Sequence, residues 1–161
     1  MRLLGSGTIL REVIAAAELL EADWGIAADV FSVTSYTELR RDGMEVERHN
    51  WLHPEDEPRT AYVSEVLSGD VPVVASSDYV RELAEGIRPY LDAPYFVLGT
   101  DGYGRSDYRK ALRGFFEVDR RHVVLAALTE LSKRGEVEPS KLTEAIETYE
   151  IKTDEGVPWA R

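Results

Sequence analysis

The most singular local sequence is a glycine-rich run, Gly99-Thr100-Asp101-Gly102-Tyr103-Gly104-Arg105-Ser106-Asp107. It follows an apolar run and precedes a helical pattern, so we expect it at the carboxyl edge of a sheet, where open α/β proteins place ligands and contacts. Gly102 and Gly104 allow a tight path with positive φ. Ser106 or Asp107 can cap the next helix, and Arg105 offers a planar fork to a carboxylate. Two roles remain open for this loop: a capped turn whose Arg105 pairs within the domain, or a contact between domains or subunits.

A second glycine turn lies near the start of the chain, where Gly5-Ser6-Gly7 separates an apolar run from a helical pattern. Dinucleotide-binding proteins place a pyrophosphate at such a turn, against free amides of a helix N-terminus. The third glycine of that motif would fall at position 10, which is Leu10, and no acidic residue ends the second predicted strand. We therefore expect a turn-forming role here, with nucleotide binding as the alternative.

His49 and His53 have the four-residue separation that would place two imidazoles on one helical face for a metal ion. His53 precedes Pro54, however, and a residue before proline is disfavoured in the helical region. We expect His53 to lie off the helix and both histidines to be hydrogen-bonded structural residues. The spacing suggests no third ligand, and the sequence contains no nucleophile elbow, Walker loop or zinc-protease motif. No catalytic, cofactor-binding or metal-binding residue is therefore assigned.

Strands and helices alternate along the chain in the pattern of a parallel sheet. Hydrophobic periodicity and turn residues predict strands near 1–5, 27–33, 71–75 and 95–99, and helices near 9–24, 35–50, 80–87, 106–115, 119–134 and 139–149. Asp119 can cap the helix that follows it, and Gly135 supplies its left-handed end. Right-handed crossovers between parallel strands then give an α/β fold, a three-layer α/β/α open parallel sheet with helices on both faces.

Composition excludes several classes of partner. The chain has 161 residues, a length that suits one domain, with 30 Asp and Glu against 19 Lys and Arg and a net charge of −11. That charge repels phosphate backbones and anionic lipids, so we expect neither nucleic acid nor a membrane as a partner. There is no cysteine, and we find no membrane-length apolar run and no signal peptide, so we expect a cytoplasmic protein. Residues 42–70 are locally acidic, with eight acids and two arginines.

Several segments in register resemble the C-terminal domain of the homodimeric bacterial pyruvate dehydrogenase component, a transketolase C-terminal-like domain. They are Leu3-Leu4-Gly5-Ser6-Gly7-Thr8-Ile9-Leu10-Arg11, Asp29-Val30-Phe31-Ser32-Val33-Thr34-Ser35-Tyr36-Thr37-Glu38-Leu39 and Leu98-Gly99-Thr100-Asp101-Gly102-Tyr103-Gly104-Arg105-Ser106-Asp107. Shorter matches include Leu52-His53-Pro54, Phe116-Glu117-Val118-Asp119 and Lys133-Arg134-Gly135-Glu136, so the resemblance covers nearly the whole chain.

The resemblance implies that residues 1–161 are the third domain of a longer subunit. In this family the first two domains bind thiamine diphosphate and magnesium across a dimer interface, and the whole enzyme decarboxylates pyruvate and acetylates a lipoyl group of the acetyltransferase component. The family's thiamine motif, Gly-Asp-Gly followed further along by paired asparagines, cannot be assembled here, because Asn50 is the only asparagine. We therefore expect this fragment alone to bind no cofactor and to be inactive.

The resemblance also implies an additional antiparallel strand at the start of the domain, which we expect this sequence to lack. Four parallel strands would remain, in the order second, first, third, fourth. The expected role is assembly, with contacts to the other domains and the second subunit at His53 within residues 52–59 and at Asp101, Gly102, Tyr103, Gly104, Arg105 and Ser106. The alternative is a free-standing flavodoxin-like module that binds a phosphorylated small ligand near residues 5–8 and 101–106.

Overall fold

Four parallel strands form the centre of the computed structural model, which describes residues 1–160. The strands are β1 (Arg2–Gly5), β2 (Asp29–Ser32), β3 (Val73–Ser76) and β4 (Tyr95–Leu98), in the order β2-β1-β3-β4. Arg2 pairs with both Asp29 and Val73, and Val73 pairs with Tyr95, so all four strands start and end nearly level. The predicted strand order and the open parallel sheet are confirmed.

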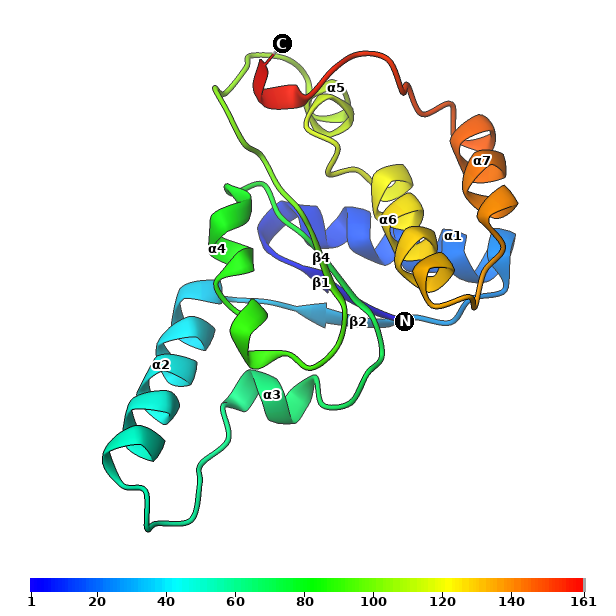
Figure 1. The fold of residues 1–161 in the computed structure, drawn as a ribbon. Coiled ribbons are helices and arrows are strands. Elements are labelled where there is room, and N and C mark those ends of the chain that lie inside the picture. Colours follow the sequence, from blue (N-terminus) through cyan, green and yellow to red (C-terminus); the bar gives the residue numbers. More distant parts are fainter. Residues whose placement is uncertain (161) are drawn as a thin grey trace.

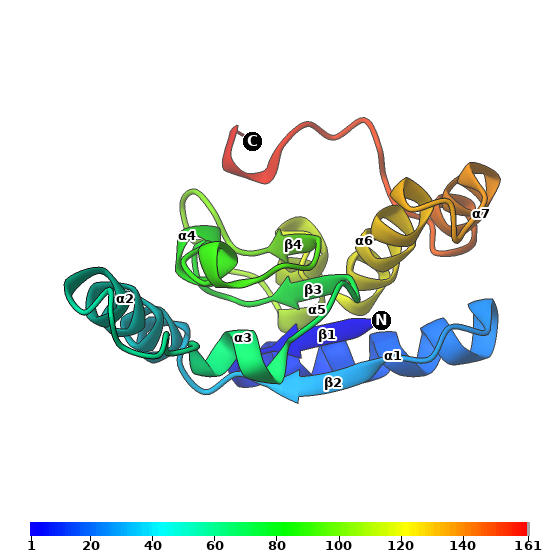
Figure 2. The ribbon, with the colours of Figure 1, turned by 60° about the horizontal axis from the view of Figure 1, so that its bottom comes forward.

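Helices cover both faces of this sheet (Figures 1 and 2). The helices are α1 (Leu10–Trp24), α2 (Tyr36–Leu52), α3 (Tyr62–Val66), α4 (Arg81–Glu85), α5 (Arg109–Phe115), α6 (Arg120–Lys133) and α7 (Pro139–Thr148), with short 3-10 helices η1 (Gly7–Ile9), η2 (Arg88–Tyr90) and η3 (Pro158–Ala160). α1 and α6 pack on one face, and α2, α3 and α4 lie on the other, so the three-layer prediction is also confirmed.

Successive strand residues point to opposite faces, and this alternation divides the core in two. Leu3 and Val74 join the cluster formed with α1 and α6, whereas Leu4, Val73 and Ala75 join the cluster formed with α2, α3 and α4. A doubly covered parallel sheet requires strands that are apolar on both sides, and β3 is fully buried as that rule demands.

The end of α1 and both ends of α6 lie at the capping residues that the sequence predicts. Gly25 ends α1 with a φ of 67°, and Gly135 follows α6 with a φ of 73°. Asp119 caps α6, because its side chain accepts hydrogen bonds from the amides of Arg121 and His122. The capping predictions for these helices are confirmed.

The predicted start and cap of one helix are wrong, and one short helix lies outside the predicted elements. The helix predicted from residue 106 begins at Arg109, and neither Ser106 nor Asp107 caps it; Asp107 Oδ1 instead accepts a hydrogen bond from the adjacent amide of Tyr108 at 2.7 Å. The short helix α3 was not predicted at all. Five residues are too few to display a 3.6-residue period. Within residues 1–160, no helix has the length and apolar character needed to span a membrane.

Candidate functional site

The carboxyl ends of the strands meet at one edge of the sheet, and polar groups there bind one another. Ser6 Oγ, after β1, donates to Ser77 Oγ, after β3, at 3.0 Å in a buried position. Gly5 is required for packing, because a Cβ at this position would lie 2.8 Å from Leu10 Cα. This geometry supports the turn-forming interpretation of Gly5-Ser6-Gly7. Because Gly5 has no side chain, the helix at Leu10 can pack closely against the turn, and the hydroxyl of Ser6 is already bonded to Ser77.

The glycine-rich loop after β4 is fixed at its first residues. Asp101 accepts two hydrogen bonds from Arg81, one from the backbone amide at 3.0 Å and one from Nε at 2.6 Å. Partial burial opposes ionisation, but the hydrogen bonds and charge of Arg81 hold the pKa of Asp101 below its usual range. Asp101 therefore remains a carboxylate that ties this loop to the start of α4.

The rest of the loop is open to solvent. Gly102 has a φ of 91°, as predicted, whereas Gly104 has no positive φ and would accommodate a Cβ in open space. Tyr103 is 95% exposed, and Ser106 is also exposed. The guanidinium of Arg105 lies 4.3 Å from the ring centre of Phe115, as a cation–π contact. The structure brings these residues to one surface but shows no partner molecule, so their contact role stays a prediction.

The second predicted contact region, residues 52–59, lies at and after the end of α2; with the last turns of that helix it makes up residues 44–60, which we call the acidic arm. His53 has a φ of −127° and follows the last residue of α2, which confirms that it lies off the helix. The rings of His49 and His53 stack with centroids 4.6 Å apart, and a nitrogen of each lies 3.9 Å from Asp56 Oδ2. Desolvation, aided by the charges of Arg59 and His53, lowers the pKa of His49. In the part of the chain that the structure describes, no three His, Cys, Asp or Glu side chains are grouped closely enough to hold a metal ion.

Asn50, the single asparagine, joins the end of α2 to the far end of the acidic arm. Asn50 Nδ2 donates to the carbonyl of Arg59 at 2.9 Å, and Asn50 Oδ1 accepts from the amide of Arg59 at 2.9 Å. Because both the nitrogen and the oxygen of the side-chain amide are bonded, the loop of residues 53–58 is held to the end of α2. Sequence reasoning noted that Asn50 is unique but did not identify this role; an amide side chain before a proline-rich loop was the available signal.

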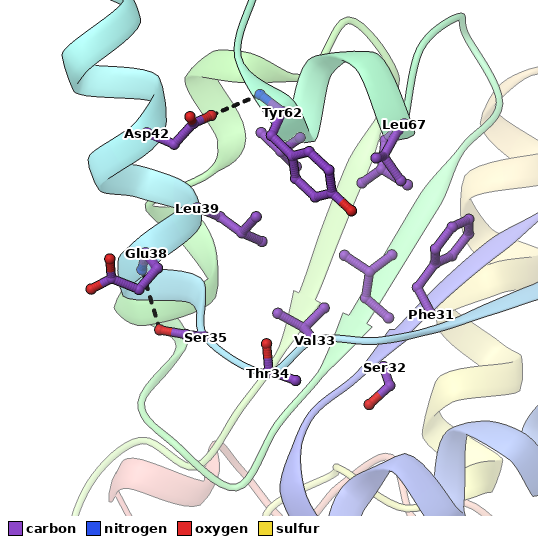
Figure 3. A pocket seen from close by; sticks show the side chains of 13 residues that line it. Phe31, Ser32, Val33, Thr34, Ser35, Glu38, Leu39, Asp42, Tyr62 and Leu67 are labelled. Atoms are coloured by element: carbon purple, nitrogen blue, oxygen red, sulfur yellow. Dashed lines mark hydrogen bonds between the residues drawn. The ribbon is translucent and has the colours of Figure 1, made fainter.

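An apolar cavity that sequence reasoning missed lies beside the edge strand β2 (Figure 3). Its volume is about 560 Å³, and it is enclosed by β2, the segment after it, α2 and α3; the lining includes Leu4, Phe31, Val33, Leu39, Val63, Val66 and Leu67. Asp42 Oδ2 accepts a hydrogen bond from the amide of Tyr62 at 2.7 Å and so fixes α3 against α2. No other strand of the described residues pairs with the outer side of β2.

The opposite face is closed by charged groups that are paired inside the chain. Glu12 on α1 is 6% exposed and accepts hydrogen bonds from Arg113 at 2.7 Å and from Arg120 at 2.9 Å. Asp119 is bound by Arg121 and His122, and although burial opposes ionisation, these hydrogen bonds and charges lower the pKa of Asp119 to about 2. The pairs of Glu12 join α1 to α5 and to the start of α6.

Comparisons with a family model and with individual proteins indicate the same family. A family model described as the transketolase-like C-terminal domain matches residues 1–119. Over 160 residues the chain is 57% identical to a protein of Pseudomonas aeruginosa named "Pyruvate dehydrogenase E1 component", a match that covers 98% of this chain and 18% of that protein. Relatives of the same name from Cupriavidus necator and Escherichia coli are 53% and 52% identical over 159 residues, with the same coverage. The chain thus spans about 18% of the length of the relatives that it matches.

Proposed function

The chain belongs to the family of transketolase-like C-terminal domains, and from this premise we propose that it is the C-terminal domain of a pyruvate dehydrogenase E1 component. Residues 1–161 would then form one domain of a longer, thiamine-diphosphate-dependent subunit in a cytoplasmic homodimer. The whole subunit would decarboxylate pyruvate and acetylate lipoyl groups on the acetyltransferase component of the complex. The domain itself would serve assembly. The observation that carries this proposal is the 57% identity along 98% of the chain.

The residues of this chain do not suit thiamine diphosphate or magnesium. Magnesium in such sites prefers carboxylate and amide oxygens, and the only asparagine, Asn50, already uses its amide oxygen to accept from Arg59. Within residues 1–160, no three His, Cys, Asp or Glu side chains are grouped so that they could hold a metal ion. We therefore assign the cofactor and the chemistry to the remaining domains, and no step of the reaction to this one.

Two surfaces support an assembly role. The first is the side of the sheet at β2, where the strand edge is unpaired and the cavity of about 560 Å³ is lined mainly by apolar side chains. Nearby, Trp51 is 76% exposed and Met44 and Tyr62 are also exposed. An exposed strand edge beside an apolar cavity favours pairing with a further strand. We place the additional antiparallel strand of the family here, supplied by the part of the subunit that precedes this domain.

The second surface is the loop of residues 101–107. Tyr103 and Arg105 in this loop are of residue types that are enriched in the centres of protein interfaces. Asp101 fixes the start of the loop to Arg81, whereas Tyr103 at the tip is exposed to solvent. We propose that this tip contacts another domain or the second subunit.

An immunoblot of the source cells, with an antibody raised against this chain, tests the proposal most simply. An 18.1-kDa chain that spans 18% of its relatives predicts a polypeptide of roughly 100 kDa. That polypeptide, once purified, should turn over pyruvate with thiamine diphosphate and magnesium, and residues 1–161 alone should not. A band only near 18 kDa, or pyruvate turnover by the isolated chain, would contradict the proposal.

The competing function, a flavodoxin-like module for a phosphorylated ligand, has one observation in its favour. A cavity of about 210 Å³ lies at the carboxyl edge, with Thr8, Thr100 and Arg109 among its lining residues. Against it, the hydroxyl of Ser6 is already bonded to Ser77. Calorimetry with flavin mononucleotide separates the two functions: sub-millimolar binding to the isolated chain supports the module, and no heat of binding supports the assembly domain.

A further inference from the structure

The last residues of the described chain return to the carboxyl edge of the sheet. Residues 151–160, which we call the C-terminal strap, run from α7 past α5 to the loop that follows β4 (Figure 1). The strap is anchored at its start by Tyr149. Its hydroxyl donates to Asp23 Oδ2 at 2.7 Å and accepts from Trp24 Nε1 at 2.8 Å, and its carbonyl accepts from Arg121 at 3.2 Å.

The far end of the strap rests on the glycine-rich loop. The guanidinium carbon of Arg81 lies 4.6 Å from the ring centre of Trp159, which is a cation–π contact. Trp159 also lies directly against Gly102, because a Cβ on Gly102 would be 2.9 Å from Trp159 Cα and 3.0 Å from Trp159 Cβ. Pro158, next to it, is buried.

Arg81 joins three segments at this point. Its side chain crosses Gly99, where an added Cβ would be 2.7 Å from Arg81 Cγ, and its Nε donates to Asp101. Its other contact is the ring of Trp159. Two of the three glycines of the loop are thus explained by their neighbours: Gly99 leaves room for Arg81, and Gly102 leaves room for the strap.

Between its two anchors the strap covers a cavity of about 320 Å³. Glu150, Ile151, Lys152 and Glu155 form one side of this cavity, and residues of α5 and the start of α6, including His122, form the other. Residues 152–157 are exposed. Of the two ends of the strap, the one at Trp159 has the smaller set of contacts among the described residues.

We propose that the C-terminal strap is a latch whose catch is Trp159, seated on Gly102 and Arg81, and that the closed latch holds the 99–102 part of the loop against the start of α4. Release of Trp159 uncovers Arg81 and Gly102, leaves the hydrogen bonds of Asp101 as the remaining tie between the loop and α4, and opens the cavity under the strap. Segments with few buried contacts open locally at a lower free energy than the core, so such release does not require unfolding of the sheet. The proposal concerns the isolated chain and holds whether or not the chain serves assembly.

Hydrogen exchange followed by NMR tests the latch at two amides. The amide of Arg81 donates to Asp101 Oδ1, and the amide of Thr100 donates to the carbonyl of Tyr79 at 2.9 Å. Trp159→Ala should speed exchange at both by about tenfold, the factor that corresponds to loss of a well-formed cation–π contact with its packing. Trp159→Phe keeps an aromatic face over Arg81 and should restore most of the protection.

Matched variants separate the latch from general destabilisation. Gly104→Ala, in the same loop, should leave both amides unchanged, because that position has open space and no positive φ. Gly102 does not suit this comparison, because its φ of 91° would strain the loop in any variant. Trp51→Ala, which removes an exposed tryptophan of the acidic arm, should leave both amides unchanged. Unchanged exchange in Trp159→Ala, or an equal acceleration at amides of the buried strand β3, overturns the proposal.

Discussion

On the face of the sheet covered by α1 and α6, the charged side chains at the helix contacts find partners within the chain. Glu12 is bound by Arg113 and Arg120, and Asp119 is bound by Arg121 and His122. On the face covered by α2, α3 and α4, the chain leaves an apolar cavity of about 560 Å³ next to an unpaired strand edge. The charged groups of the first face are paired within the chain, whereas the second face has an apolar opening beside a strand edge. This difference is the basis of our proposal that the β2 side meets the rest of a larger subunit.

Leucine truncations should show the difference most strongly. Leu20 on α1 is fully buried, whereas Leu39 on α2 lines the open cavity and is only partly buried. Leu20→Ala should lower the free energy of unfolding by about 3 kcal/mol, because it opens a void in close-packed surroundings. Leu39→Ala should cost about 1 kcal/mol, because less surface is lost from the core. Urea unfolding of both variants measures this; equal costs would mean that the second face is packed as tightly as the first.

Loss of the ion pairs on the first face should have the next largest effect. Glu12→Ala leaves Arg113 and Arg120 without their shared carboxylate and should lower stability by about 2 kcal/mol, less than a fully buried pair because the Arg120 side chain is 47% exposed. Arg41→Ala breaks the exposed pair with Glu38 on the other face and should change stability by less than about 0.5 kcal/mol. If the two variants unfold at the same urea concentration, the ion pairs of the first face contribute no more than surface pairs.

Low pH should lower the stability of the face covered by α1 and α6, because it protonates the carboxylate of Asp119. The folded-state pKa of Asp119 is lowered from 3.8 to about 2, so its stabilising contribution is complete above pH 3.8 and is lost as the pH falls toward 2. The loss is about 2 kcal/mol at most. Asp119→Asn retains a side chain that can cap α6 but removes the charge. Unfolding measured from pH 6 to pH 2 should therefore show a shallower decline in this variant than in the parent, and identical slopes would contradict the assignment.

The sequence predicted what depends on short-range pattern. Apolar runs gave the four strands, and Asp119, Gly25 and Gly135 marked helix ends, because each acts on its immediate neighbours. The bonds that shape the candidate surfaces join distant residues instead. Asn50 binds Arg59, and Trp159 contacts Gly102. The hydrophobic periodicity of the sequence predicts neither contact.

The cavity beside β2 was equally beyond prediction. The second strand looked mostly apolar in sequence, as a buried strand does, yet in the structure most of β2 is exposed. Of its two apolar residues, Val30 is exposed and Phe31 packs at the margin of the core. Only the tertiary structure could show that they lie at an edge beside an opening and not under a helix.

Hydrogen exchange of the isolated chain and of the same residues within the full subunit is the most direct test of the central claim. If residues 1–161 are a C-terminal domain that meets its subunit through the β2 side, the amides of β2 (residues 29–32) and of the acidic arm (residues 44–60) should exchange at least about tenfold more slowly in the full subunit. Amides of α1 and α6 should exchange at similar rates in both. Equal exchange at β2 and the arm in the two forms, or added protection confined to α1 and α6, would contradict the account.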